Sequence, residues 1–312
     1  MTLYYNSPIE PRELQILKIL TDRMDIPSDS TKRHYNLQKG YEGEVKFHTA
    51  LKENLSSDCL VLYDLCLDEK GSNFQTDCII IKQRKIYYIE VKNFVGDYMI
   101  EDNTLYNLTS KKEVNNPISQ MKRGKRLLEE LLGKHGFNFP IKPYTIFIHS
   151  EFALYQLPTT LPLVLPNQIH RFINNINNTH SKLSSVHYKL AQRLLSVQNP
   201  SSSSNQVPEY EFEQLKKGIR CLHCDGYLVD GDFHRRILSC NLCGCPESRE
   251  SAIIRSVDEY SILFPERKIT TNAIWSWCGE VISKYKIRNV LFQFLKPIGE
   301  KNRLYFNSPY KR

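Results

Sequence analysis

The sequence predicts an α/β protein whose mixed sheet is flanked by helices and followed by smaller helical and cysteine-containing modules. The order helix, three strands, helix, strand between residues 36 and 150 predicts the mixed sheet. Two Cys-x2-Cys motifs after a serine-rich stretch predict a separate small module. Apolar residues at helical spacing beyond residue 251 predict a further helical domain.

These features divide the chain into six expected segments. They are an N-terminal extension at 1–35, an α/β domain at 36–150, a helical appendage at 151–198, a linker at 199–206, a four-cysteine zinc module at 207–250 and a basic helical domain at 251–312.

The composition is that of a globular protein, because 41% of the 312 residues are hydrophobic and 24% are charged. No apolar run reaches the ~18 residues that a membrane helix needs. The N-terminus lacks the basic segment and apolar run of a signal peptide. We therefore expect a cytoplasmic protein whose nine cysteines stay reduced and serve as metal ligands or core residues.

Positive charge is concentrated near the C-terminus. The whole chain carries +8, and residues 251–312 hold 11 lysines and arginines against 5 acidic residues, a net charge of +6. This asymmetry favours a polyanion partner such as nucleic acid for the C-terminal segment. The alternative is a basic surface without a binding role.

Residues 74–93 predict a two-stranded hairpin. The apolar run Ile79–Ile81 predicts the first strand, Gln83–Lys85 the turn, and Ile86–Val91 the second strand. β-branched and aromatic residues dominate both runs, as is typical of buried strands.

Charged residues lie on this hairpin. Asp77 falls near the start of the first strand, and Glu90 and Lys92 fall near the end of the second. Because strand side chains alternate, Glu90 and Lys92 share one face. Two carboxylates can bind a hard divalent cation through oxygen, and a lysine can orient or polarise an attacking water. The alternative is a solvated strand face with a cross-strand ion pair.

Glu44 belongs to an expected amphipathic helix at residues 39–54. It lies on the same helical face as Phe47 and Leu51, which point to the core. An inward carboxylate is costly unless it is paired or binds a metal ion. The alternative is an acidic residue in the first turn that interacts with the helix dipole.

Gln120 belongs to a second expected helix. Asn116 suits the N-cap and Pro117 the first helical position. Gln120 falls on the same face as Leu127 and Leu131, so its amide points inward. The alternative is a buried amide whose hydrogen bonds are satisfied within the core.

Four short motifs together resemble a known family. They are G-x-x-G-E from residue 40, Q-T-D from residue 75, I-E-V-K-N from residue 89 and N-P-I-S-Q from residue 116. In this order and at these distances, residues 36–150 resemble the nuclease-related domain, NERD. The resemblance implies the restriction-endonuclease-like, PD-(D/E)XK fold. It also implies active-site roles for Glu44, Asp77, Glu90, Lys92 and Gln120.

The family chemistry agrees with the chemistry of these residues. Asp77 and Glu90 would hold Mg²⁺ or Mn²⁺ beside the scissile phosphate. Lys92 would orient the attacking water or stabilise charge on the phosphate. Glu44 would complete the acidic pocket, and Gln120 would bond substrate or water. A fold that binds nucleic acid without cutting it is the alternative.

The Cys-x2-Cys pairs are separated by fifteen residues, a strong tetrahedral zinc pattern. The predicted ligands are Cys221, Cys224, Cys240 and Cys243. Four thiolates would repel one another without a metal ion, so we expect structural Zn²⁺ to drive folding of this module. Cys245 or His223 could replace one of the ligands.

The C-terminal segment predicts a helix-turn-helix. Thr270 or Thr271 caps a short helix, Gly279 ends it, and Ser283 begins a second helix, with 303–306 as a wing strand. The residues expected to face nucleic acid are Lys284, Lys286, Arg288 and Asn289. Two helices separated by a glycine also occur in proteins that bind no nucleic acid.

The sequence therefore favours a Mg²⁺-dependent DNA nuclease that its zinc and basic helical modules deliver to the substrate, with RNA left open. A catalytically idle DNA-binding or regulatory protein is the main alternative. A scaffold for protein contacts is the third hypothesis.

Overall fold

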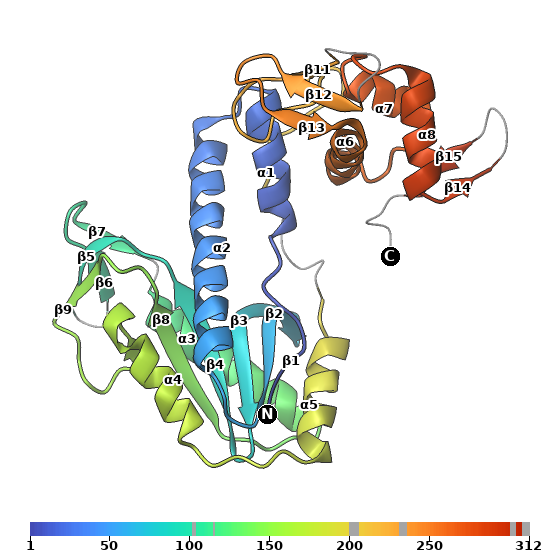
Figure 1. Ribbon diagram of the computed structural model, residues 1–312. Coiled ribbons are helices and arrows are strands. Elements are labelled where there is room, and N and C mark those ends of the chain that lie inside the picture. The colour runs from blue at the N-terminus through green and yellow to red at the C-terminus, as the bar shows by residue number, and fades with distance from the viewer. Residues whose placement is uncertain (102–103, 115, 200–205, 231–235, 300–303, 308–312) are drawn as a thin grey trace. The chain divides into compact units, whose positions relative to one another are not determined.

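The computed structural model describes residues 1–101, 104–114, 116–199, 206–230, 236–299 and 304–307 (Figure 1). It forms two compact units. Unit 1 combines Met1–Pro11 with Tyr35–Ser204, and unit 2 combines Arg12–His34 with Asn205–Arg312. The expected N-terminal extension is thus divided between both units. Most of the expected linker, 200–205, lies outside the described residues.

The described strands of unit 1 include a mixed sheet with the order β1-β2-β3-β4-β8-β10. The pairs β1–β2, β4–β8 and β8–β10 are parallel, whereas β2–β3 and β3–β4 are antiparallel. The strands are β1 (Thr2–Tyr4), β2 (Cys59–Glu69), β3 (Ser72–Lys82), β4 (Lys85–Lys92), β8 (Ile141–Phe147) and β10 (Leu163–Val164). The predicted mixed α/β sheet is therefore present.

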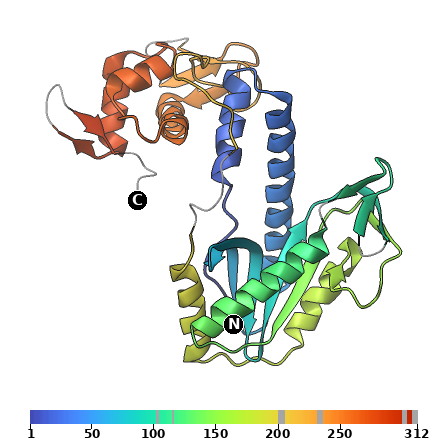
Figure 2. The same cartoon turned by 180° about the vertical axis from the view of Figure 1, so that it is seen from behind.

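Helices cover both faces of this sheet (Figures 1 and 2). The part of α2 (Ser28–Asn54) in unit 1 packs with α4 (Ile169–Asn177) on one face, through residues such as Phe47 and Phe172. On the other face, α3 (Pro117–Lys134) and α5 (Ser185–Ser196) pack against a second apolar layer. Burial on both sides explains why β4 is apolar almost throughout.

The start of α3 follows the predicted capping chemistry. The Asn116 side chain accepts a 3.0 Å hydrogen bond from the Ile118 N–H, and Pro117 occupies the first turn. This cap fixes where the helix begins, and it therefore fixes the position of Gln120 one turn later.

A second, smaller sheet has the order β7-β6-β5-β9. Strands β5 and β6 pair antiparallel as a hairpin near Tyr98, and this hairpin belongs to the second sheet. The segment after residue 151 also differs from the expected helical appendage, since two short strands precede its helices. The elements are β5 (Gly96–Glu101), β6 (Thr104–Asn107), β7 (Lys112–Val114), β9 (Phe152–Tyr155) and a 3₁₀ turn, η1 (Pro166–Gln168).

Unit 2 is built around one apolar core that contains Trp277, fully buried. Helices α1, α6, α7 and α8 contribute to this core together with the small sheet β11-β12-β13. Its elements are α1 (Arg12–Arg23), β11 (Leu228–Val229), β12 (Ile237–Cys240), β13 (Pro246–Ser248), α6 (Arg249–Leu263), α7 (Thr271–Trp277), α8 (Lys284–Phe294), β14 (Pro297–Ile298) and β15 (Tyr305–Phe306).

The C-terminal helices end and begin where the sequence predicts. Thr270 caps α7 by accepting from the Ala273 N–H, and Ser283 caps α8 by accepting from the Lys286 N–H. Strands β14 and β15 pair antiparallel after α8 in the expected place of the wing. Arg303, expected to start the wing strand, lies outside the described residues.

None of the described helices combines the length and the apolar character that crossing a bilayer requires.

Candidate active site and metal centre

One cleft of unit 1 gathers every residue expected at the acidic site. It has a volume of about 760 Å³ and opens between α2, the first half of β3, the end of β4 and the start of α3. The predicted residues that line it are Glu44, Asp77, Glu90, Lys92 and Gln120.

Glu90 is the most tightly held of these side chains and is only 1% exposed. Its Oε1 accepts a 2.6 Å hydrogen bond from the Tyr88 hydroxyl, and its Oε2 accepts a 2.9 Å bond from Gln120 Nε2. Lys92 Nζ lies 3.6 Å from the same Oε2. Burial, followed by the charge of Asp77, nevertheless raises the pKa of Glu90 to about 8.

Lys92 and Gln120 form the second half of this network. Lys92 Nζ donates a 3.0 Å hydrogen bond to Gln120 Oε1. Gln120 is therefore not an amide satisfied within the hydrophobic core, because it faces the cleft and both of its amide atoms bond site residues. The amide orients an ammonium and a carboxylate at the same time.

Asp77 lies in the middle of β3, not at its start, because the strand begins five residues earlier at Ser72. Its Oδ2 accepts a 2.6 Å hydrogen bond from the Val91 N–H of β4. Burial raises the pKa of the Asp77 carboxyl, and the Lys92 ammonium opposes that rise. The second carboxylate oxygen of Asp77 is thus available to bind a ligand in the cleft.

Glu44 reaches the cleft because α2 passes very close to the end of β4. A Cβ at Gly43 would lie 2.8 Å from Asn93 Cβ, and Asn93 Nδ2 donates a 2.8 Å hydrogen bond to the Lys39 carbonyl. Burial, then the charges of Asp77 and Asp64, raise the pKa of Glu44 to about 9. This environment agrees with an inward carboxylate rather than a solvated residue of the first turn.

Asp64 is a fourth acidic group that sequence reasoning missed. The β2–β3 register pairs Tyr63 with Cys78 and Leu65 with Thr76, so Asp64 lies across from Asp77. Its backbone has φ +50°, and burial raises the pKa of its carboxyl to about 6. The signal in the sequence was an acid within the apolar run of residues 59–67.

Tyr88 and Gly124 were also missed. The Tyr88 hydroxyl contacts Glu90 directly, and it fits beneath α3 only because position 124 has no side chain. A tyrosine within an apolar strand and a glycine within a helix gave no sign of this pairing, since the two meet only when α3 packs on β4.

The acidic cleft has the donor chemistry that a hard divalent cation requires, since its candidate ligands are carboxylate oxygens. Among the described residues, the group of three or more His, Cys, Asp or Glu side chains that could hold a metal ion consists of four cysteines and not of these carboxylates. The pKa values of Glu44 and Glu90 are raised first by burial and second by the charge of Asp77.

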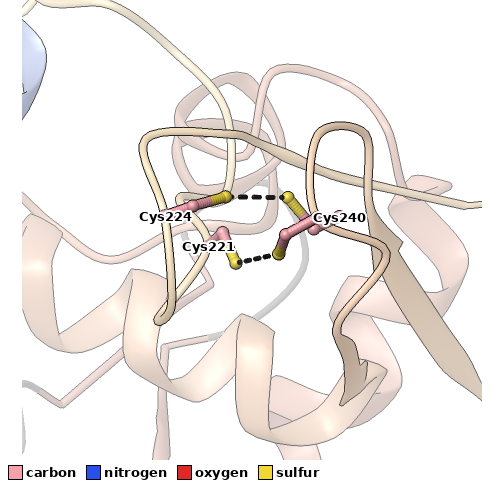
Figure 3. Close-up of side chains that lie close together, drawn as sticks. Cys221, Cys224 and Cys240 are labelled. Carbon is pink, nitrogen blue, oxygen red and sulfur yellow. Dashed lines mark hydrogen bonds between the residues drawn. The ribbon is translucent and has the colours of Figure 1, made fainter.

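The cysteine cluster lies in unit 2 and consists of Cys221, Cys224, Cys240 and Cys243. The Sγ atoms of Cys221 and Cys243 are 3.7 Å apart, and those of Cys224 and Cys240 are 3.4 Å apart (Figure 3). Zinc–sulfur bonds of about 2.3 Å in a tetrahedron place sulfurs about 3.8 Å apart. This cluster could therefore hold a metal ion such as zinc.

Backbone N–H groups in the two Cys-x2-Cys turns point at the cysteine sulfurs. Leu242 N lies 3.4 Å from Cys240 Sγ, and His223 N lies 3.3 Å from Cys221 Sγ. Hydrogen bonds from the backbone of Cys243 and Leu242 lower the pKa of Cys240 to about 6. Neither Cys245 nor the imidazole of His223 belongs to the cluster, so the four cysteines are the ligand set that this geometry supports.

The expected nucleic-acid residues on α8 fall into two groups. Lys284 Nζ stacks 4.0 Å from the Trp275 ring centroid, and Lys284, Arg288 and Asn289 are exposed. Lys286 differs, because its Nζ lies 3.4 Å from Asp230 Oδ2 and its side chain is only 26% exposed. Lys286 therefore faces the cysteine module rather than solvent.

Comparison with known proteins supports the family resemblance over one part of the chain. Residues 39–148 match the family model described as the nuclease-related domain, NERD. Neither the comparison with curated proteins nor that with solved structures gives a match. All five predicted residues of the acidic cleft lie inside the matched stretch, so unit 1 carries the features of a nuclease-related domain.

Proposed function

We propose that this protein is a Mg²⁺- or Mn²⁺-dependent nuclease of the PD-(D/E)XK type that hydrolyses phosphodiester bonds of DNA. The observation that carries the proposal is the convergence of Glu44, Asp77, Glu90, Lys92 and Gln120 on one cleft inside the nuclease-related region. Those residues come from four different elements and span much of the domain.

Asp77 and Glu90 are the proposed cation ligands, with Glu44 completing the acidic pocket. A divalent cation, when bound, supplies Lewis-acid stabilisation of phosphate charge and makes a nearby water more acidic. The chain already holds the Asp77 and Glu90 side chains through the Val91 N–H, the Tyr88 hydroxyl and the Gln120 amide.

Lys92 and Gln120 act on the substrate side of the same cleft. The Lys92 ammonium is partly exposed at 19%, so it can donate a hydrogen bond to a phosphate oxygen or orient the attacking water. Gln120 holds that ammonium 3.0 Å from its own Oε1 and so limits the positions that it can take.

Unit 2 is proposed to deliver the nuclease to DNA. Zinc at the cysteine cluster would be structural, because four thiolates leave no open coordination position for a reaction. The exposed Lys284, Arg288 and Asn289 of α8 would contact nucleic acid. RNA is a second substrate to be tested.

A catalytically idle DNA-binding protein is the second candidate. It is favoured by one observation: among the described residues, the group of three or more side chains that could hold a metal ion is made of the four cysteines and includes no carboxylate of the cleft. In that case Glu90 would stay paired with the Lys92 ammonium and hydrogen-bonded to Gln120 and Tyr88. The cleft would then bind nucleic acid without cutting it.

Cleavage assays separate the two candidates. Supercoiled plasmid, linear DNA and RNA are incubated with the full chain in Mg²⁺, in Mn²⁺ and in EDTA. The variants Glu90→Gln, Asp77→Asn and Lys92→Met each remove one proposed role. Glu113→Gln is the matched control, because Glu113 lines the same cleft outside the proposed set.

We expect metal-dependent cutting that falls by roughly 100-fold or more in each site variant and is nearly unchanged in Glu113→Gln. Cutting that persists in EDTA, or in Glu90→Gln, contradicts the proposed site. Retained DNA binding in a gel-shift assay without any cutting by the wild-type chain supports the idle protein instead.

A further inference from the structure

The mouth of the acidic cleft carries an exposed aromatic ring that the proposed chemistry does not use. Tyr35 of α2 lines the cleft and is 58% exposed. Lys39, one helical turn later, also lines the cleft, and its Nζ lies 4.9 Å from the Tyr35 ring centroid. A large exposed aromatic beside a cation is the pairing that proteins use to bind single nucleic-acid strands.

This pair has a fixed position with respect to the acidic group at the base of the cleft. Tyr35 precedes Glu44 by nine residues of the same helix, which corresponds to about 13 Å along its axis. The Lys39 carbonyl is bonded to Asn93, next to Lys92, so this stretch of α2 is anchored to the end of β4. A ligand on Tyr35 therefore lies beside the acidic groups and not among them.

The path between Tyr35 and Glu44 is open. Gly40 lies between them and lines the cleft, and a Cβ added there would meet no atom within 4 Å. A nucleic-acid strand can thus run along α2 from Tyr35 to Glu44. A second aromatic, Phe94, lines the cleft and stacks on Tyr98 with ring centroids 5.4 Å apart.

We propose that Tyr35 and Lys39 form a nucleotide subsite in which an unpaired base stacks on the Tyr35 ring while Lys39 pairs with the adjacent phosphate. In a duplex both faces of a base are covered by its neighbours, so a side chain can stack only on an unpaired or terminal base. The preferred substrate is therefore a strand with unpaired bases beside the scissile bond: a single strand, a flap or an end.

The test rests on the proposed nuclease function and uses the full chain with labelled oligonucleotides. A single abasic nucleotide is moved stepwise along a single-stranded substrate, and cleavage in Mg²⁺ and binding in Ca²⁺ are both measured. The variants are Tyr35→Ala, Tyr35→Phe and Lys39→Met. Tyr188→Ala is the matched control, because Tyr188 is an exposed helical tyrosine outside the cleft.

For the wild-type chain we expect one abasic position near the scissile bond to weaken binding by roughly 5- to 100-fold, the range for one stacked base. Tyr35→Ala should show that loss on intact single strands and no further loss at the same abasic position. Tyr35→Phe should behave like the wild-type chain, since it keeps the ring. Lys39→Met should weaken binding at every position and reduce its salt dependence.

Gly40→Leu provides a separate test of the path, since it fills the space between the two ends of the cleft. We expect it to impair cleavage of single strands.

Three results would overturn the subsite. They are equal binding by Tyr35→Ala and the wild-type chain, an equal loss on blunt duplex and on single strands, or unimpaired cutting of single strands by Gly40→Leu. Cutting that remains metal-dependent in those cases leaves the nuclease proposal intact. Absence of cutting by the wild-type chain removes the nuclease function, whereas the Ca²⁺ binding series still decides whether Tyr35 stacks a base.

Discussion

The Tyr88 hydroxyl donates a 2.6 Å hydrogen bond to Glu90 Oε1, and this contact orients the most deeply buried acid of the cleft. It depends on a third residue in another element. Gly124 of α3 packs directly over the Tyr88 hydroxyl, and any Cβ there would overlap it. The catalytic proposal therefore depends on helix packing as well as on the residues that line the cleft.

Gly124→Ala should damage the site even though residue 124 does not line the cleft. The added methyl group would displace Tyr88, remove the bond to Glu90 and destabilise unit 1 by about 1–3 kcal/mol through overpacking. We expect cleavage to fall together with the unfolding temperature. Metal-dependent cutting and thermal unfolding measure the two effects.

Gly133→Ala is the control for this prediction. It lies in the same helix, and its added Cβ would meet nothing within 4 Å. The better helix propensity of alanine should leave the protein unchanged or more stable by up to about 1 kcal/mol. If both variants behave alike, the close packing of Gly124 on Tyr88 is not important.

The stability of the metal-free protein should fall as the pH rises, because the pKa of Glu44 is raised to about 9 from an ordinary value of 4.5. Between these values the folded state holds a proton that the unfolded state has released. The stabilisation is thus complete below the unfolded pKa and is lost as the pH rises through about 9.

Glu44→Gln tests this directly, since the amide cannot ionise. Its unfolding temperature should change less with pH in the upper part of that window. Lower steps should remain, since the pKa of Glu90 is raised to about 8 and that of Asp64 to about 6. Mg²⁺ should stabilise the wild-type chain more at high pH, because ionised carboxylates bind the cation. Identical pH profiles for the wild-type chain and Glu44→Gln would contradict the buried-acid assignment.

Zinc removal should unfold part of unit 2. Leu228, Leu238 and Cys240 of the cysteine module belong to the same core as α6, α7 and α8, so loss of the metal should lower the unfolding temperature of that unit. Chelation followed by circular dichroism measures the effect. Helical signal that is unchanged after zinc is stripped would be evidence against a structural ion.

The ligand set has its own test by zinc analysis of purified variants. Cys243→Ser should lose bound zinc because it removes one of four clustered thiols. Cys245→Ser and His223→Ala should retain it, since neither side chain belongs to the cluster. Zinc loss in either of these two variants would show that the substituted side chain is a zinc ligand.

The basic residues of α8 should separate into binding and structural positions. Lys284→Ala and Arg288→Ala should weaken DNA binding and reduce the salt dependence by about one phosphate contact each. Lys286→Ala should mainly lower stability, by about 1–3 kcal/mol, because it leaves Asp230, whose side chain is only 6% exposed, with one fewer partner. Salt-dependent titrations and thermal unfolding distinguish these roles. Equal losses of affinity in all three variants would assign Lys286 to the DNA surface.

Local patterns in the sequence were sufficient for much of this molecule. The Asn116, Thr270 and Ser283 caps form as predicted, since capping depends only on residues a few positions apart. The two Cys-x2-Cys pairs form one cluster for a similar reason. Their spacing suits two tight turns whose thiols can bind the same metal ion.

Features made by distant segments could not be found in the same way. The sharing of Met1–Pro11 and Arg12–His34 between two units depends on where each apolar face is buried. The strands around Phe152 and Leu163 fall in a segment that was expected to be mostly helical. They were missed because short extended segments lack a periodic pattern and acquire their pairing only from neighbours.

The sequence by itself determined which chemical groups the protein has: five polar residues in the order of a nuclease-related domain and four cysteines at zinc spacing. Only the tertiary structure decided how they are held. It placed Asp64 opposite Asp77, brought Tyr88 under Gly124 and turned Lys286 toward Asp230. Side-chain type is encoded at each position, but burial and distance arise only when helices and strands far apart in the chain pack together.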